Sequence, residues 1–340
     1  MISSILLKFT SGKPIKLFYF IRKGLQQLLP DAYFQRRLVQ TIRRARLRDD
    51  YDYILQRVNY YCKWSSPWTI DTIDEAYRGR SFFSYRGEVA GYKRKMFCSA
   101  YYYDQHDVTK WFDQHFRWDF CPGDVYFTPQ TPTVVKSRVL FEDNSCSVLL
   151  KLDKLRHFMF LNDPIPFTGK KDVAIFRGKI RLSRIRTAFM ERFIHNPLVD
   201  CGVVDPREEV PLEWIKPKMS ILQHLDYKFI LALEGNDVAS NLKWVMSSNS
   251  LAVMTRPTCE TWFMEGTLQP DVHYVEVKDD FSDLEEKLNY YINHPQEAQL
   301  IIDNAHQYVS QFMDAEREQL IQLMVMNRYF YLSGQMPSYY

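Results

Sequence analysis

Familiar nucleotide-binding signatures are missing from this sequence of 340 residues. It contains no Gly-x-x-x-x-Gly-Lys loop, which cradles phosphates in P-loop proteins, and no Gly-x-Gly-x-x-Gly fingerprint of dinucleotide-binding folds. ATP hydrolysis and dinucleotide-dependent redox chemistry therefore lose support. The sequence has eight histidines, and His294 and His306 lack partner ligands at metal-binding spacing. Ordinary surface or core roles explain the histidines better than a metal centre does.

Paired cysteines and long apolar runs are absent as well. The six cysteines are widely scattered and form no Cys-x-x-Cys pair, so neither a zinc knuckle nor a disulfide framework is indicated. Reduced thiols in a cytosol fit this pattern best. No run of about eighteen apolar residues occurs, and no signal-peptide pattern is recognisable. We therefore expect a cytoplasmic protein, which lies on the inner face of the membrane if it meets one.

The sequence is rich in aromatic side chains, with 22 Tyr and 23 Phe. Such a surplus suits sugar or lipid contacts, because aromatic rings stack on apolar faces while the phenol reaches water. A large aromatic core explains it equally well. The length exceeds what one compact core usually holds, so two domains are expected.

Positive charge is concentrated at the N-terminal end, although the net charge of the chain is only +3. Nine basic residues lie between Lys8 and Arg48, with Asp31 as the one acid among them. Such a segment favours contact with an anionic surface, either a membrane or nucleic acid. Within it, apolar residues recur at helical spacing and predict an amphipathic surface helix, or a helix that packs one face on its domain. They are Phe18, Ile21, Leu25 and Leu28.

The second half of the chain alternates between predicted strands and helices, which favours a parallel sheet flanked by helices. The first half is more mixed, with predicted strands at 90–103 and 125–127 and a predicted helix at 107–114. Residues 162–171 are rich in turn formers and are the candidate linker. We predict domains at 1–165 and 166–314, followed by a helical tail at 315–340 that is long enough to return to the first domain. In the second half, the predicted strands cover 173–176, 200–204, 251–254 and 272–277, and the predicted helices cover 181–193, 284–292, 295–312 and 315–332.

A first candidate ligand site lies where a predicted strand ends. Arg177 and Gly178 close the strand, and Arg181, Arg184 and Arg186 follow at once. A glycine at a strand end lets the backbone approach a ligand, and an arginine fork suits a phosphate. An exposed basic helix is the alternative explanation.

A second cluster follows the next apolar segment and precedes a predicted helix that begins near Ala239. Small polar groups and backbone N–H groups at a helix N-terminus form an anion site, although capping by Asp237 or Asn236 explains them too. The cluster comprises Gly235, Asn236, Asp237, Ser240, Asn241 and Lys243.

Two acidic motifs complete the candidates. Glu260 lies shortly after the predicted strand at 251–254, where a carboxylate can accept hydrogen bonds from ribose hydroxyls; a solvated or helix-capping acid is the alternative. Asp50 and Asp52 satisfy the Asp-x-Asp pattern of metal-dependent sugar transferases. No predicted strand delivers them, so a metal-independent site is favoured.

At these residues the sequence resembles the family 90 glycosyltransferases, a family that includes protein O-glucosyltransferases and bacterial lipopolysaccharide-modifying proteins. The resemblance covers roughly residues 120–312 and is greatest to the bacterial lipopolysaccharide branch. It rests on IFRG at 175–178, LDYKFILALEGNDVASNLKWVMSSNSLAVM at 225–254 and ETWFMEGTLQPDVHYVEVKDDFSDLEEKLNYY at 260–291, with PTVVKSR at 132–138 and LLKLDKLRHF at 149–158 extending it.

The resemblance implies a GT-B fold, in which two Rossmann-like domains face each other across a cleft. It also implies an inverting, metal-independent reaction with a UDP-sugar donor bound mainly by the C-terminal domain. Arg177 and Gly178 match the family's phosphate-side segment, residues 236–243 match its donor-binding loop and helix, and Glu260 matches the segment beside the nucleoside.

The sequence departs from the family pattern at two places. Asn241 stands where the eukaryotic members have an arginine, so another cation must face the diphosphate; Arg181, Arg184 or Lys243 can serve. Gln130 stands where they have the catalytic aspartate, and glutamine cannot accept the proton. Either Asp124 or Asp119 supplies the carboxylate from nearby, or the chemistry differs; Asp124 is our candidate base.

We therefore expect a transferase that moves a sugar from a UDP-sugar to a lipopolysaccharide or surface-polysaccharide acceptor, with no metal and no nucleic-acid partner. Lys136 and Arg138, on a loop bounded by prolines, are expected to hold acidic groups of the acceptor. The basic N-terminus is expected to keep the enzyme near the inner membrane. Two alternatives stay open: a protein of the same fold that binds nucleotide sugars or glycans after losing catalysis, and a nucleic-acid-binding protein.

Overall fold

A computed structural model describes residues 16–26, 28–70, 85–92, 100–180 and 183–340. The chain divides into two compact units, and each is discontinuous in sequence. Within the described residues, unit 1 comprises 156–258 and 264–311, and unit 2 comprises 16–155, 259–263 and 312–340. No helix in these ranges combines the length and the apolar character that crossing a bilayer requires. Of the cysteines, Cys98 lies outside the described residues and the other five are free thiols.

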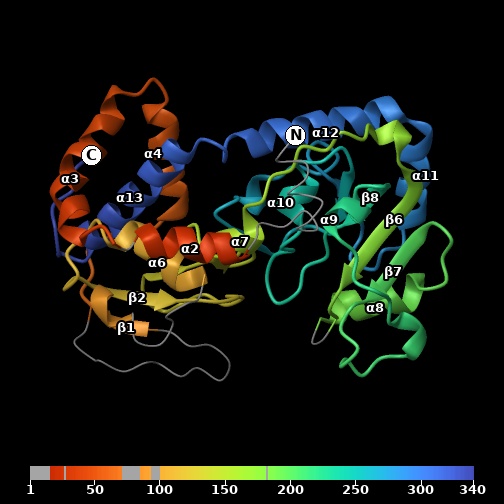
Figure 1. Cartoon of the computed structure of the whole chain (residues 1–340), viewed down its shortest axis with the longest axis horizontal. Helices are drawn as coiled ribbons and strands as arrows, with labels where there is room; N and C mark the ends of the chain where they lie inside the picture. The colour runs from red at the N-terminus through yellow and green to blue at the C-terminus, as the bar shows by residue number, and fades with distance from the viewer. Residues whose placement is uncertain (1–15, 27, 71–84, 93–99, 181–182) are drawn as a thin grey trace. The chain divides into compact units, whose positions relative to one another are not determined.

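Unit 1 is built on a parallel sheet of five strands in the order β11-β9-β8-β6-β7. Its central strands are buried over most of their length, as in sheets that are covered on both faces. β6, β7 and β8 lie side by side in Figure 1. The strands are β6 (Lys171–Gly178), β7 (Val199–Val203), β8 (Tyr227–Leu231), β9 (Leu251–Met254) and β11 (Val275–Glu276).

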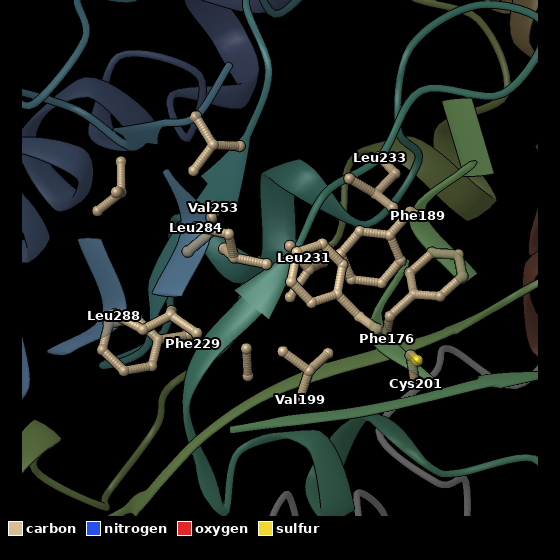
Figure 2. Packing of buried hydrophobic residues seen from close by; sticks show 14 of the residues in the cluster. Phe176, Phe189, Val199, Cys201, Phe229, Leu231, Leu233, Val253, Leu284 and Leu288 are labelled. Atoms are coloured by element: carbon tan, nitrogen blue, oxygen red, sulfur yellow. The ribbon is translucent and has the colours of Figure 1, made fainter. Parts of the chain in front are cut away.

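Helices cover this sheet and form one apolar core with it. Figure 2 shows Phe176 of β6 and Phe229 of β8 in the core, together with Phe189 of α8 and Leu284 of α11. Phe176 and Phe189 pack edge to face, with ring centroids 5.6 Å apart. The parallel sheet with its helices is Rossmann-like, which confirms the mixed α/β fold class. The helices of unit 1 are α8 (Arg184–Phe193), α9 (Ile221–His224), α10 (Leu242–Val245), α11 (Leu284–Asn293) and α12 (Pro295–Ser310), with 3₁₀ turns η3 (Phe167–Gly169), η4 (Leu212–Trp214) and η5 (Glu265–Thr267).

Unit 2 combines a helical layer with two small sheets. The larger sheet has the order β1-β2-β3-β5, in which only the β1–β2 pair is antiparallel, and β4 pairs antiparallel with β10. The C-terminal helix α13 packs against α4 and α6 of the N-terminal half. The strands are β1 (Tyr85–Glu88), β2 (Arg117–Cys121), β3 (Thr133–Val135), β4 (Ser137–Val139), β5 (Ser147–Leu149) and β10 (Cys259–Thr261), and the helices are α2 (Lys16–Gln26), α3 (Asp31–Arg44), η1 (Ala45–Leu47), α4 (Tyr51–Tyr61), η2 (Val89–Tyr92), α6 (Ala100–Thr109) and α13 (Ala315–Leu332). The short helix α7 (Lys154–His157) contains the point in the sequence, between Leu155 and Arg156, at which the chain passes from unit 2 to unit 1.

The predicted elements agree with the structure best in the second half of the chain. Strand β9 and helix α13 have the predicted bounds, and the helices predicted at 284–292 and 295–312 are α11 and α12. The prediction was wrong in the first half. Residues 100–103 belong to helix α6 instead of a strand, and 125–127 form no strand. Seven of the ten residues of α6 are buried, so the helix has almost no amphipathic pattern to reveal it. The rest of the strand predicted at 90–103 lies largely outside the described residues.

Candidate functional site at the carboxyl edge of the parallel sheet

The strand order of unit 1 reverses direction at β6. The chain passes from β6 to β7 on one side and then to β8 on the other side of β6. In open α/β sheets, ligands bind outside the carboxyl ends of the strands at such a reversal. The chain leaves β6 at Gly178 and β8 at Leu231. Both predicted clusters therefore begin at the carboxyl ends of these two neighbouring strands.

The first turn of helix α8 follows the end of β6. An α-helix leaves its first backbone N–H groups without intrahelical partners, and the Ser183 hydroxyl accepts from the N–H of Arg186 at 3.4 Å. Arg184, the first helical residue, is exposed. Gly178 is constrained by packing, because a Cβ there would lie 2.7 Å from the ring of Phe176. Arg181 lies outside the described residues.

Arg186 joins the β6 cluster to the loop after β8. Its guanidinium donates to the carbonyl of Lys179 at 2.8 Å and to that of Leu233 at 2.7 Å. The hydroxyl of Ser183 also donates to the carbonyl of Glu234, at 3.3 Å. The structure therefore brings the two predicted clusters together.

The loop after β8 presents small and polar residues at the same edge. Gly235 lies against the Arg186 guanidinium, which a Cβ on Gly235 would approach to 3.1 Å. Asn236 and Ser240 are exposed, whereas Asp237 is buried. Asn241 precedes α10, and its amide donates to the carbonyl of Leu231 at 2.9 Å. That bond fixes the start of α10 to the end of β8.

Arg177 is directed toward β7. Its guanidinium donates to the backbone carbonyl of Asp200 at 2.8 Å and to the Asp200 carboxylate at 2.7 Å. Burial by itself raises the pKa of the Asp200 carboxyl, but hydrogen bonds from Arg177 and Lys216 outweigh it, and the net pKa is below its ordinary value. Arg177 is thus held by an ion pair beside the proposed anion site.

Lys243 is completely buried within unit 1, where it forms an ion pair with Glu265. The adjoining residue Met264 has a left-handed backbone with φ of 56°, which leads the chain into η5. Three cations could replace the family's arginine. Of these, Lys243 is buried, Arg181 lies outside the described residues and Arg184 is exposed.

Glu260 lies in unit 2, on β10. It is the register partner of Arg138 on β4, and the two side chains form an ion pair with Arg138 Nε 2.7 Å from Glu260 Oε1. Neither side chain is exposed. The Tyr60 hydroxyl also donates to this carboxylate, and burial and Glu260 together raise the pKa of the phenol. Both oxygens of Glu260 are therefore engaged inside unit 2.

The two candidate bases are also paired. Asp124, in the loop after β2, accepts a hydrogen bond from Lys136 Nζ at 2.6 Å, and Lys136 is buried. Asp119, on β2, is held by Arg86 through two hydrogen bonds of 2.6 Å. Asp124 is the more accessible of the two, because Asp119 is buried. Gln130 is exposed.

The Asp-x-Asp motif opens helix α4. Asp50 accepts hydrogen bonds from Arg48 at 2.7 and 3.0 Å, and the Arg48 guanidinium lowers the pKa of the carboxyl to about 2 although slight burial opposes this. Arg317 adds a contact of 3.2 Å. Within the described ranges no group of three His, Cys, Asp or Glu side chains is arranged to hold a metal ion.

Sequence reasoning did not identify the contacts that link the strand ends. Glu234, in the loop after β8, accepts a hydrogen bond from the backbone N–H of Thr258 at 3.1 Å. Thr258 follows β9, so this bond joins the exits of two neighbouring strands. The position of Glu234 beside the glycine of its loop was the available signal.

Comparisons with known proteins agree with the sequence resemblance. The model of the family described as Glycosyl transferase family 90 matches residues 150–337. The O-glucosyltransferase LpsA of Dichelobacter nodosus is 38% identical over 322 residues, which cover 93% of this chain and 96% of that protein. The uncharacterized protein 035R of Invertebrate iridescent virus 3 is 27% identical over 124 residues, which cover 36% of this chain and 11% of that protein.

Proposed function

Because this chain belongs to glycosyltransferase family 90, we propose that it moves a sugar from a UDP-sugar to a hydroxyl of a lipopolysaccharide or surface-polysaccharide acceptor. The reaction inverts the anomeric centre and needs no metal. Its relative in Dichelobacter nodosus is named an O-glucosyltransferase, so glucose is the first sugar to test. We assign the chain to the GT-B class as part of this proposal.

One observation carries the proposed donor site. At the reversal of strand order between β6 and β8, Ser183 and Arg186 join the first turn of α8 to the loop after β8, and the exposed Arg184 lies in that same turn. A cationic side chain and a helix N-terminus favour a diphosphate, because both present positive charge and N–H donors. Arg186 and Asp200 position this site: Arg186 holds the loop, and Asp200 holds Arg177.

The chemistry that we propose is a single displacement. The acceptor oxygen attacks the anomeric carbon from the face opposite the diphosphate, the bond from that carbon to the phosphate oxygen breaks, and UDP leaves. Positive groups at the donor site stabilise the charge that develops on UDP. A base takes the proton of the acceptor hydroxyl, and Asp124 is our candidate. Lys136 orients the Asp124 carboxylate through the ion pair of 2.6 Å.

Calorimetric binding of UDP-glucose tests the donor site. Arg184→Ala should weaken binding at least tenfold, because a charge-assisted hydrogen bond is worth about 1.5–3 kcal/mol. Arg192→Ala is the matched control, since Arg192 is exposed in the last turn of the same helix. Equal binding by both variants and the wild type would remove Arg184 from the site.

Release of UDP, measured with and without a chelator, tests the reaction. Metal-independent release in the presence of an acceptor supports the proposal, and Asp124→Asn should abolish it while donor binding is retained. Tight donor binding without release for any acceptor would instead favour the alternative of lapsed catalysis, for which the exposed Gln130 is the motivating residue. Loss of release on chelation would contradict metal independence.

A further inference from the structure

Helix α2 packs against unit 2 through its polar side chains. The Tyr19 hydroxyl donates to Asp104 Oδ1 of α6 at 2.6 Å. Lys23 pairs with Asp107, which is also on α6, and the Lys23 Nζ atom lies 3.8 Å from Asp104 Oδ1. The Lys23 side chain is only 5% exposed, and burial lowers the pKa of its ammonium group although Asp107 opposes this. The polar side chains of Tyr19 and Lys23 therefore lie on the inner face of α2.

Most of the described apolar residues of α2 are exposed; Phe20, whose ring lies 5.7 Å from that of Tyr103 on α6, is the exception. Phe18 is 60% exposed, Ile21 48% and Leu25 61%, and the turn after the helix adds Leu28 and Leu29 at 76% and 51%. A surface helix normally turns its apolar stripe to the core and its charges to water, whereas α2 buries Lys23 and exposes Phe18, Ile21 and Leu25. Figure 1 shows α2 as the red-orange helix beside α6. A contiguous apolar row of this kind marks an interaction surface.

Exposed arginines are frequent on α2 and on the helix that follows it in sequence. Arg22 lies on α2 itself, Arg36 and Arg37 lie on α3, and Asp31 is the one acid from residue 16 to residue 48. Arg43, Arg44 and Arg46 are exposed as well. Exposed apolar side chains in a segment with a strong excess of exposed arginines match a bilayer surface with anionic headgroups. A nucleic acid would leave the leucines without apolar partners, and a second copy of this chain would bring like charges together.

We propose that α2 and the turn at Leu28–Leu29 dock unit 2 onto an anionic lipid surface. Phe18, Ile21 and Leu25 enter the boundary between headgroups and acyl chains, and Arg22 and the arginines of α3 face the lipid phosphates. The contacts of Tyr19 and Lys23 with α6 transmit this attachment to the rest of the unit. The proposal does not depend on the identity of the donor sugar.

Vesicle co-sedimentation of the full chain tests the proposal. The wild type should bind vesicles of equal parts phosphatidylglycerol and phosphatidylcholine more tightly than vesicles of phosphatidylcholine alone, and added salt should weaken binding. The double variant Ile21→Gln with Leu25→Gln should bind the anionic vesicles at least tenfold more weakly, because two apolar side chains are lost from the contact. Leu300→Gln is the matched control, because Leu300 is a helical leucine of α12 with 62% exposure, and it should bind as the wild type does.

Three outcomes would overturn the proposal. They are no vesicle binding by the wild type, equal binding by the double variant and the wild type, or equal loss in the double variant and Leu300→Gln. Self-association that the double variant abolishes, without vesicle binding, would identify a second copy as the occupant instead. Donor binding in vesicle-free buffer should be unchanged in the double variant, so failure of this proposal is distinguishable from failure of the proposed function.

Discussion

Arg138 and Glu260 face each other across the antiparallel pair of β4 and β10, and neither side chain is exposed to solvent. Their atoms Nε and Oε1 are 2.7 Å apart, although the residues are 122 positions apart in sequence. Arg138 also donates to the carbonyl of Tyr60 at 2.8 Å. This ion pair joins residues 259–263 to the part of unit 2 that comes from the N-terminal half.

Glu260→Ala should destabilise the protein by about 3–5 kcal/mol, because it leaves the Arg138 guanidinium buried without its carboxylate. Urea unfolding followed by circular dichroism measures the loss. Glu142→Ala is the control, since Glu142 is an exposed acid of the same unit, and it should change the free energy of unfolding by no more than about 0.5 kcal/mol.

Binding of the donor distinguishes the two roles that Glu260 can have. A contact with the nucleoside, which the family resemblance implies, predicts weaker binding of UDP-glucose by Glu260→Ala at a temperature where the variant is folded. That result would contradict a purely structural ion pair. Loss of stability with retained donor affinity at low temperature would contradict the nucleoside contact.

Asp200→Asn should destabilise unit 1 in a pH-dependent way. The folded-state pKa of Asp200 is below its ordinary value of about 3.9. The stability that it contributes is therefore present above pH 4 or so and is lost as the pH falls through the folded pKa. We expect a difference of about 1 kcal/mol at neutral pH, because partial exposure screens the pair.

Urea unfolding of both proteins from neutral to acidic pH measures this effect, and the difference should shrink toward the acidic end. Asp279→Asn is the control, because Asp279 is an exposed acid of the same unit. A difference that stays constant with pH would show that the Asp200 carboxylate contributes through its shape and not through its charge.

Gly235→Ala should weaken donor binding about tenfold. The added methyl group would meet the Arg186 guanidinium at 3.1–3.4 Å, where the group holds the carbonyls of Lys179 and Leu233. Displacing those hydrogen bonds costs about 1–2 kcal/mol and moves the loop that we propose to bind the diphosphate. Calorimetry with UDP-glucose checks this expectation.

Gly169→Ala is the matched control for that substitution, since a Cβ there meets its nearest neighbour at an ordinary contact of 3.6 Å. It should leave the affinity for UDP-glucose unchanged. Wild-type affinity in Gly235→Ala would mean that the loop does not touch the donor, or that Arg186 moves aside without disturbing it.

The sequence by itself determined those elements whose signals are local. Strand β9 and helix α13 have their predicted bounds because apolar residues and chain-breaking residues mark both ends. The two clusters at the ends of β6 and β8 were also recognisable, because a glycine with polar residues after an apolar run marks the exit of a buried strand. Alternation of strands and helices predicted the parallel sheet of unit 1.

Tertiary structure alone decided the features that depend on distant partners. Helix α6 is buried on most sides, so its sequence carries no helical period, and α2 exposes its apolar face because Asp104 and Asp107 hold Tyr19 and Lys23. The pairing of Glu260 with Arg138 was equally hidden. A buried charge is stable only beside its counterion, and which counterion it meets depends on segments that approach each other in space and not on any local pattern.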